Sequence, residues 1–180
     1  MYDSMTAEAE VLDFLKSLVI TAKPALIVET GTFSGLSTLR MAEGLQANGA
    51  GRIITCEYDP KVFAAAKKRF ESSGLAKWIE ARHESSLEMK VEGMIDLLFC
   101  DSDLAIREQE VRHFLPQMSP DGLILMHDAN SAMSVVREGA LRLEEQGLLS
   151  VLLFSTPRGL VVAQKKTRNA ALQGSDTENH

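Results

Sequence analysis

The sequence predicts an α/β domain built on a doubly wound, mostly parallel sheet. Short apolar runs alternate with segments in which apolar residues recur every three or four positions, the pattern of buried strands between amphipathic helices. The 180 residues are 45% hydrophobic and 24% charged, which fits one domain with its own core. Because crossovers between parallel strands are right-handed, this order of elements places helices on both faces of the sheet.

The pattern predicts twelve elements, whose bounds follow from apolar runs and from residues that stop or start helices. In chain order they are a helix over residues 6–23, strand 25–28, helix 36–46, strand 52–56, helix 60–74, strands 78–82 and 95–100, helix 104–115, strand 123–126, helix 131–146, and strands 148–154 and 160–163.

Residues that favour helix ends mark the elements of the first half of the chain. Pro24 ends the first helix, and Gly49 suits the left-handed conformation that closes the second. The third helix begins at Asp59-Pro60, because Asp caps free amides and Pro is tolerated at the first helical position.

The second half of the chain carries turn signals of a different kind. Pro116 ends or kinks a helix, and residues 119–122, Ser-Pro-Asp-Gly, predict a turn before the fifth strand. Residues 155–159 predict a hairpin, so the last strand runs antiparallel and completes a seven-stranded sheet. We assign residues 1–166 to the domain and 167–180 to a polar, disordered tail.

The net charge of the chain disfavours some classes of binding partner. The 19 Lys and Arg against 25 Asp and Glu give a net charge of -6, which disfavours binding to nucleic acid. No basic cluster precedes an apolar core at the start, and no apolar run approaches the roughly 20 residues of a bilayer span, so neither a signal peptide nor membrane insertion is expected. With two cysteines, both at the ends of apolar runs, we expect a reducing, cytoplasmic location.

A carboxylate follows each of the first five predicted strands. In doubly wound sheets, ligands bind beyond the carboxyl ends of the strands, where the strand order reverses. Acidic residues crowded at one edge repel each other unless a cation or a hydroxyl-rich ligand compensates them. The residues concerned are Glu29, Glu57, Glu84, Asp101 and Asp128.

The turn after the first strand, residues 29–35, is similar to a nucleotide-binding loop but differs from the dinucleotide pattern G-x-G-x-x-G. Phe33 stands where the middle glycine would allow a pyrophosphate to approach, and Glu29 would repel one. Glu57, at the end of the second strand, is placed to accept hydrogen bonds from both hydroxyls of a ribose. Together these residues favour an adenosine ligand that has a cationic, phosphate-free group.

At these positions the sequence resembles the class I S-adenosylmethionine-dependent methyltransferases, over about residues 7–164. The resemblance rests on Glu29-x-Gly31-x-x-x-Gly35, Glu57, Glu84-Ser85, Asp101 and the terminal hairpin. Residues 28–38 are most similar to the small-molecule O-methyltransferases of the catechol and caffeoyl-CoA type, and to their relatives with a His-Asp pair after strand five. The resemblance implies a Rossmann-like methyltransferase fold that binds S-adenosylmethionine and methylates a small hydroxylated acceptor.

The resemblance also implies a role for individual residues. Glu29 would lie near the ammonium group of the methionine part, and Ser37 would contact its carboxylate. Glu57 would hold the ribose, while Tyr58 would pack beside the adenine and Glu84 would address its amino edge. The complete implied set for the cofactor is Glu29, Gly31, Thr32, Phe33, Ser34, Gly35, Ser37, Glu57, Tyr58, Glu84, Ser85 and Asp101.

The same resemblance makes Asp101 and Asp128 candidate ligands of Mg²⁺, which prefers carboxylate oxygens and water. Two positions depart from the catechol type: Ala129 follows Asp128 where that type has Asn, and Leu104 replaces its catalytic lysine. His127 is then the candidate general base, with Asp101 beside the methyl group. The alternative is that Asp101 and Asp128 cap helices and contact the cofactor without a metal ion, and that His127 is structural.

Two other functions stay open at this point. One is a catalytically silent domain that binds S-adenosylmethionine as a sensor or subunit, which the residues at positions 104 and 129 favour. The other is a nicotinamide-dependent reductase, which Phe33 disfavours. The sequence does not identify the methyl acceptor, and the apolar face of the first helix leaves a homodimer open.

Overall fold

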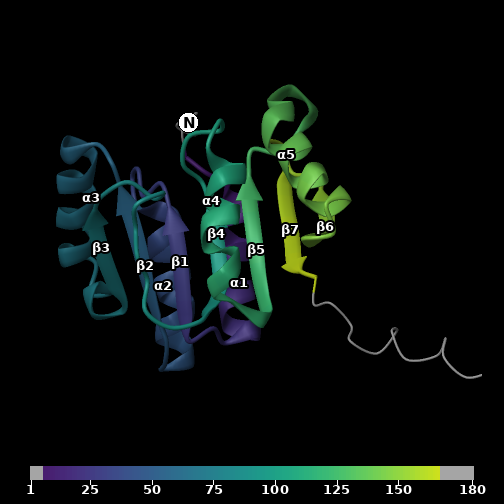
Figure 1. Cartoon of the computed structure of the whole chain (residues 1–180). Coiled ribbons are helices and arrows are strands. Elements are labelled where there is room, and N and C mark those ends of the chain that lie inside the picture. Colours follow the sequence, from purple (N-terminus) through teal and green to yellow (C-terminus); the bar gives the residue numbers. More distant parts are fainter. Residues whose placement is uncertain (1–5, 167–180) are drawn as a thin grey trace, which may run out of the picture.

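The computed structural model of the chain describes residues 6–166, without the side chain of residue 133. It contains one seven-stranded sheet with the order β3-β2-β1-β4-β5-β7-β6 (Figure 1). The predicted doubly wound, mostly parallel sheet is therefore confirmed. The predicted polar tail at residues 167–180 lies outside the described residues.

The helices and strands alternate along the chain as the apolar pattern indicates. Their bounds are α1 (Ala9–Ala22), β1 (Leu26–Thr30), α2 (Leu36–Asn48), β2 (Arg52–Glu57), α3 (Pro60–Ser72), β3 (Ile79–His83), β4 (Ile95–Cys100), α4 (Arg107–Phe114), β5 (Met118–His127), α5 (Ser134–Glu145), β6 (Leu149–Phe154) and β7 (Leu160–Lys165). Short 3₁₀ turns at Ala76–Trp78, Leu115–Gln117 and Ser131–Met133 precede β3, β5 and α5.

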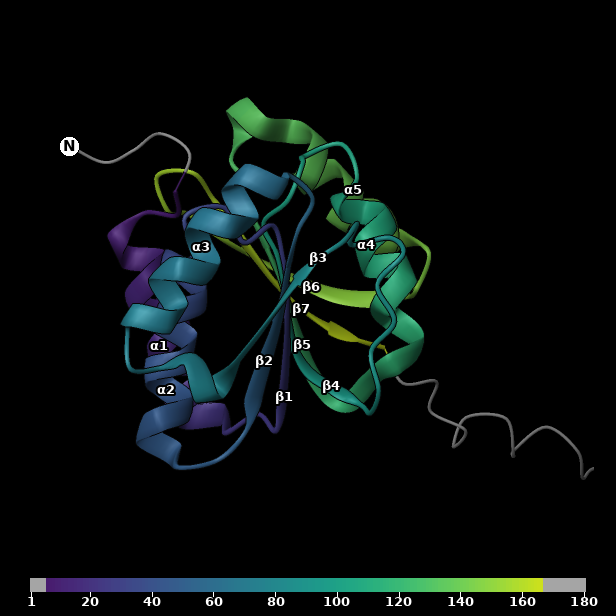
Figure 2. The same ribbon diagram turned by 90° about the vertical axis from the view of Figure 1, so that its left-hand side faces the viewer.

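The helices form a layer on each face of the sheet. Figure 2 shows α1, α2 and α3 on one face and α4 and α5 on the other. Neighbouring residues of β1 point into opposite layers: Ile27 packs with the α1 and α2 residues Leu15 and Leu45, whereas Val28 packs with Phe114 of α4. None of the helices within residues 6–166 combines the length and the apolar character that a membrane crossing requires.

The predicted turn at residues 119–122 is wrong. Met118–His127 is one strand, and its pairing with β4 shifts register between the pairs Ile95–Met118 and Leu97–Leu123. Pro120 and Asp121 are exposed within this irregular stretch, so Pro does not remove a hydrogen bond that a central strand would need.

The last strand is antiparallel to both of its neighbours, as predicted. β7 lies between β5 and β6 and pairs antiparallel with both, and its arrow points opposite to that of β5 in Figure 1. Its hairpin also approaches the loop after β5 closely, since the amides of Ala129 and Asn130 donate to the carbonyls of Gly159 and Arg158. A Cβ on Gly159 would lie 2.2 Å from the backbone nitrogen of Asn130, so only glycine fits there.

The strand order reverses between β1 and β4, which pair in parallel at the centre of the sheet. The loops that follow these two strands therefore leave in opposite directions along the sheet and open a space at their carboxyl ends. Gly31 and Asp101 are the first residues after β1 and β4. They are in contact, because a Cβ on Gly31 would lie 2.6 Å from the carbonyl oxygen of Asp101.

This contact predicts a large difference between two glycine substitutions. Gly31 and Gly49 both have positive φ, +80° and +70°, but a Cβ on Gly49 meets nothing within 4 Å. Gly49→Ala should therefore cost only the left-handed strain, about 1 kcal/mol. Gly31→Ala adds a clash with backbone, and its free energy of unfolding in urea should be lower by about 2 kcal/mol or more than that of Gly49→Ala. Equal losses in the two variants would show that β1 and β4 do not approach so closely.

Candidate ligand site at the carboxyl ends of the strands

A cavity of about 410 Å³ opens where the strand order reverses. A cavity of this size is typical of a small-molecule or cofactor site. It is lined by the predicted residues Gly31, Phe33, Glu57, Tyr58, Glu84, Ser85 and Asp101, and by Cys56, Ser86, Ser102, Asp103 and Ile106, which the sequence analysis did not single out.

A second, smaller hollow adjoins this cavity on the side of the chain's first described residues. Gly31, Phe33 and Asp101 line both spaces. The smaller hollow adds Thr32, Ser34 and Ser37 of the predicted set, and Thr6, Ala7 and Leu36 complete its walls. All of the predicted cofactor residues except Glu29 and Gly35 therefore line one or both of these adjoining spaces.

The turn between β1 and α2 is held in a strained shape. Gly31, Phe33 and Gly35 all have positive φ, and Phe33, at +44°, is not a residue that adopts this conformation readily. The amides of Gly31 and Thr32 both donate to the carbonyl of Cys56, which fixes the turn on β2. Gly35 lines neither hollow; a Cβ there would lie 2.5 Å from the ring of Phe70, so this glycine serves the packing of the turn on α3.

Glu57 lines the cavity and is fixed by backbone donors. Its Oε2 accepts from the amide of Phe33 at 2.9 Å, and its Oε1 accepts from the amide of Asp59 at 2.9 Å. Each carboxylate oxygen has room for a second hydrogen bond, so the group remains able to bind two ligand hydroxyls. Tyr58 next to it is 78% exposed, which leaves its ring free to cover a flat ligand group.

Glu29 lies beneath the turn and not at the wall of either hollow. Its side chain is fully buried and accepts hydrogen bonds from the hydroxyls of Ser37, at 2.5 Å, and Thr38. Burial raises the pKa of Glu29 to about 7, the bonds from Ser37, Thr38 and Thr55 oppose this rise, and the charge of Asp101 adds to it. In this structure the side chain of Glu29 therefore does not line the space where a ligand ammonium group was predicted to contact it.

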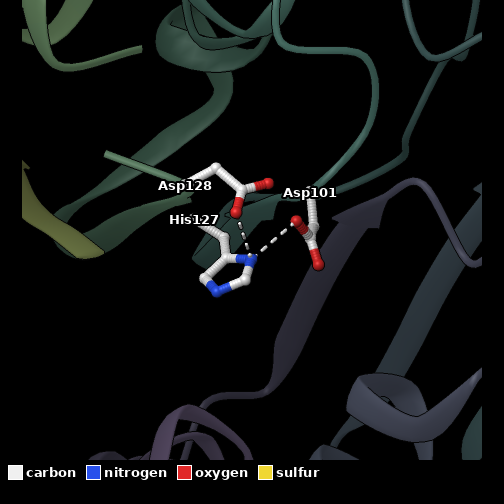
Figure 3. Close-up of side chains that lie close together, drawn as sticks. All are labelled: Asp101, His127 and Asp128. Atoms are coloured by element: carbon white, nitrogen blue, oxygen red, sulfur yellow. Dashed lines mark hydrogen bonds and ion pairs between the residues drawn. The ribbon is translucent and has the colours of Figure 1, made fainter. Parts of the chain in front are cut away.

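Three further predicted residues meet at the ends of β4 and β5. Figure 3 shows the Nδ1 atom of His127 between the carboxylates of Asp101 and Asp128. The distances are 3.1 Å to Oδ1 of Asp101 and 3.5 Å to Oδ1 of Asp128. One ligand atom from each residue lies within 4.8 Å of the others, which by spacing alone would suit a metal ion. Asp128 has a φ of +60°, so the loop holds this carboxylate in a strained conformation.

Two arginines already pair with these carboxylates. Nη2 of Arg107 lies 3.2 Å from Oδ1 of Asp101 and 3.1 Å from Oδ2 of Asp128. Nε of Arg158, from the β6–β7 hairpin, lies 2.5 Å from Oδ1 of Asp128. The donor atoms expected to hold Mg²⁺ are therefore bound to the chain's own cations, and the set does not fit the ion.

His127 is a poor candidate for a general base because carboxylates bind both of its ring nitrogens. Its Nε2 lies 2.7 Å from Oε2 of Glu8, opposite the contact of Nδ1 with Asp101. Burial alone lowers the pKa of His127, but the hydrogen bond and charge of Asp101, the charge of Asp128 and the bond to Glu8 together raise it. A carboxylate accepts hydrogen bonds, so a ring with a carboxylate at each nitrogen donates from both as an imidazolium, which is the structural alternative considered for this residue.

Sequence reasoning missed the partners Glu8, Arg107, Glu110 and Arg158. Glu8 sits 119 residues before His127, and no local pattern links them. Glu110 is fully buried and accepts from the hydroxyls of Ser86 and Ser102, two residues of the cavity wall. The sequence carried a signal at two positions, Leu104 and Ala129, which differ from the residues of the metal-dependent catechol type. These differences indicated that Asp101 and Asp128 bind something other than a metal ion.

Comparison with known proteins identifies a family for the chain. A family model described as a methyltransferase domain matches residues 28–129, more than half of the chain. The chain is 32% identical over 132 residues to a protein of Niastella koreensis named catechol O-methyltransferase, with 70% of this chain and 56% of that protein covered. It is 28% identical to a protein of Mycobacterium sp. (strain JLS) named as an O-methyltransferase by inference, with 77% and 70% covered. The chain thus spans little more than half of the Niastella protein.

Solved structures show the same fold at lower identity. A methyltransferase of Podospora anserina bound to S-adenosylhomocysteine superposes with a TM-score of 0.82 at 23% identity, with 91% of this chain and 81% of that chain covered. An O-methyltransferase of Bacillus cereus in complex with the same product superposes with a TM-score of 0.80 at 21% identity, with 91% and 84% covered.

The burial of Glu29 predicts a pH-dependent stability. Folded Glu29 keeps its proton up to about pH 7, whereas the unfolded chain releases it near 4.5, so the folded state binds more protons between these values and loses stability as pH rises. Glu29→Gln should remove about 2 to 3 kcal/mol of this decline, measured as urea unfolding free energy across that window. The raised pKa of His127 also lowers stability as pH rises, but it does so in the parent protein and in Glu29→Gln alike. It therefore cancels when the two unfolding free energies are subtracted. Parallel pH curves for the variant and the parent protein would contradict the burial of a titrating carboxyl group.

Proposed function

Since the chain belongs to the class I S-adenosylmethionine-dependent methyltransferases, we propose that it transfers a methyl group to a hydroxyl oxygen of a small acceptor molecule. The observation that carries this proposal is the cavity at the ends of β1 and β4, which Glu57 and Asp101 both line. The names of the relatives, catechol O-methyltransferase among them, support an oxygen acceptor and a hydroxylated aromatic compound as the first class to test.

We propose that the cofactor lies along the cavity and the adjoining smaller hollow, which share Gly31, Phe33 and Asp101. Glu57 would accept hydrogen bonds from the ribose, Tyr58 would cover the adenine, and Glu84 and Ser85 would face its amino edge. The methionine part would lie beside Thr32, Ser34 and Ser37. The hollow that these residues line measures about 20 Å³, so it would have to widen to admit this group. Glu29 would act through the turn, because Ser37 and Thr38 already donate to its carboxyl group. The structures of the Podospora and Bacillus proteins contain S-adenosylhomocysteine, which supports this choice of cofactor.

Asp101 is the residue we propose to meet the acceptor. Its Oδ1 accepts hydrogen bonds from Arg107 and His127, and the residue lines both hollows. Its second oxygen can accept a hydrogen bond from the acceptor hydroxyl and orient it. When bound, S-adenosylmethionine would supply the methyl group from its sulfonium. The second oxygen of Asp101 would take the hydroxyl proton as the C–O bond forms and the C–S bond breaks. Positioning of the two groups for in-line attack is then the main contribution of the protein.

His127 is not part of this proposed proton path, because both of its nitrogens already contact carboxylates. Mg²⁺ is not part of it either, since the arginines bind the oxygens that the ion would need.

A cytoplasmic location stays a prediction, supported by two free, buried cysteines. A homodimer and the absence of nucleic-acid and membrane partners stay predictions as well.

The cofactor assignment predicts a specific loss on substitution of Glu57. Glu57→Gln removes the negative charge that accepts the ribose hydroxyls, and hydrogen bonds to a charged group contribute about 1.5 to 3 kcal/mol. Calorimetric titration with S-adenosylhomocysteine should show a dissociation constant raised by about 10-fold to 100-fold. Glu71→Gln, an exposed glutamate on α3, is the matched control and should bind like the parent protein. Unchanged affinity in Glu57→Gln would refute the proposed ribose site.

Transfer itself is tested by the formation of S-adenosylhomocysteine in the presence of catechols and hydroxy acids. Production that depends on an acceptor, and that falls by about 100-fold in Asp101→Asn with the affinity for S-adenosylhomocysteine kept, would support the proposed reaction. Cofactor binding without transfer to any acceptor of the panel would favour the silent binding domain over the enzyme.

A further inference from the structure

We propose that Arg107 is the resident cation of the site between Asp101 and Asp128, and that this site binds no divalent metal ion. The inference goes beyond the proposed function, and it rests on that function only where it implies that methyl transfer needs no metal. The presence or absence of an ion can be measured without any turnover.

The guanidinium of Arg107 is held from several sides. It bridges the two carboxylates through Nη2, at 3.2 Å from Asp101 and 3.1 Å from Asp128. Nε and Nη2 also donate to the carbonyl of Ser102, at 3.1 and 2.7 Å, and Nη1 donates to the carbonyl of His127. The side chain is only 2% exposed. Backbone of both loops therefore fixes the charge at this point, and it is not a flexible surface arginine that happens to lie nearby.

The charges around Arg107 are balanced without a further cation. One carboxylate oxygen of Asp128 pairs with Arg107, and the other pairs with Arg158. One carboxylate oxygen of Asp101, Oδ1, pairs with both Arg107 and the imidazolium of His127. Glu8 then balances His127 from the far side of the ring. Three carboxylates thus face two guanidinium groups and one imidazolium.

A divalent ion between the carboxylates would add two positive charges to this cluster. It would meet Arg107 and Arg158 within a few ångströms, and repulsion at such distances is strong where water is excluded. The ion could enter only if Arg107 left, and a buried guanidinium without its carboxylates is costly. Asp101, His127 and Asp128 are therefore spaced like metal ligands, but they do not form a metal site.

Arg107 acts as a positioning residue. It is the first residue of α4, and its contacts reach back to the loop after β4 and across to the loop after β5. By binding Oδ1 of Asp101 it sets the direction of the second oxygen, which we assign to the acceptor. It also neutralises Asp128, which the strained backbone holds in place.

The test measures Mn²⁺ binding by electron paramagnetic resonance, in which bound ion loses the sharp signal of free Mn²⁺. The parent protein, with and without S-adenosylhomocysteine, should leave the signal unchanged, and its thermal unfolding should be the same in EDTA and in Mg²⁺. Arg107→Met exposes the carboxylate pair, so it should bind Mn²⁺ at least about 10-fold more tightly than the parent protein and gain a Mg²⁺-dependent rise in melting temperature.

Two further variants separate this role from general stability. Arg107→Lys keeps a positive charge and should keep the site free of metal. Arg112→Met removes an exposed arginine of the same helix, which pairs with Glu108, and it should also bind no Mn²⁺. A loss of stability alone would not produce a new metal site in one variant and not in the others.

Binding of Mn²⁺ by the parent protein that is lost in Asp128→Asn would overturn the proposal. A folded Arg107→Met that gains no affinity for Mn²⁺ would overturn it too. If Arg107→Met does not fold, the parent protein still decides, because its Mn²⁺ signal and its response to EDTA are measured directly. Failure to bind S-adenosylhomocysteine would count against the proposed function and not against this inference.

Discussion

The carboxyl ends of β4 and β5 are joined by one buried guanidinium, and the geometry of the site depends on it. Arg107 binds both Asp101 and Asp128 and also the backbone of the loops that carry them. Without this charge two carboxylates would repel each other at the edge of the sheet. The loop after β5 is further fixed by the hairpin, through Arg158 and the close approach of Gly159. Asp101 is thereby held at the boundary of both hollows.

The other acidic strand ends are accommodated by different means. Glu29 is surrounded by hydroxyl groups, and its pKa is raised to about 7, so near neutral pH it carries less than a full charge. Glu57 accepts hydrogen bonds from two backbone amides and lines the cavity. Glu84 pairs with Arg82 at 3.5 Å. Of these carboxylates, Glu57 and Asp101 are best placed to meet a ligand, which is why they carry the proposed function.

Most of the fold follows from local patterns in the sequence. Apolar runs and caps such as Asp59, whose side chain accepts the amides of Lys61 and Val62, predict the alternation of strands and helices. The error at residues 119–122 arose because Pro and Gly usually mark turns, whereas here pairing with Ile95 extends the strand across them. Long-range pairing of this kind leaves no local signal.

The location of a site residue was predictable where it depends on the residue's place after a strand, as for Gly31, Glu57 and Asp101, which line the cavity. It was not predictable where the role depends on partners far along the chain. His127 was a candidate base by its type and position, but Glu8 and Asp101 occupy its two nitrogens. Asp128 was a candidate metal ligand, but Arg107 and Arg158 bind it. Only the folded arrangement of these charges distinguishes an ion pair from a metal site.

The most direct test of this account is a crystal structure of the protein grown with S-adenosylhomocysteine and Mn²⁺, with anomalous scattering recorded to locate the metal. We predict S-adenosylhomocysteine in the cavity, with its ribose at Glu57, and the guanidinium of Arg107 between Asp101 and Asp128 with no anomalous signal there. An anomalous peak between the two carboxylates, with Arg107 displaced from them, would contradict the account.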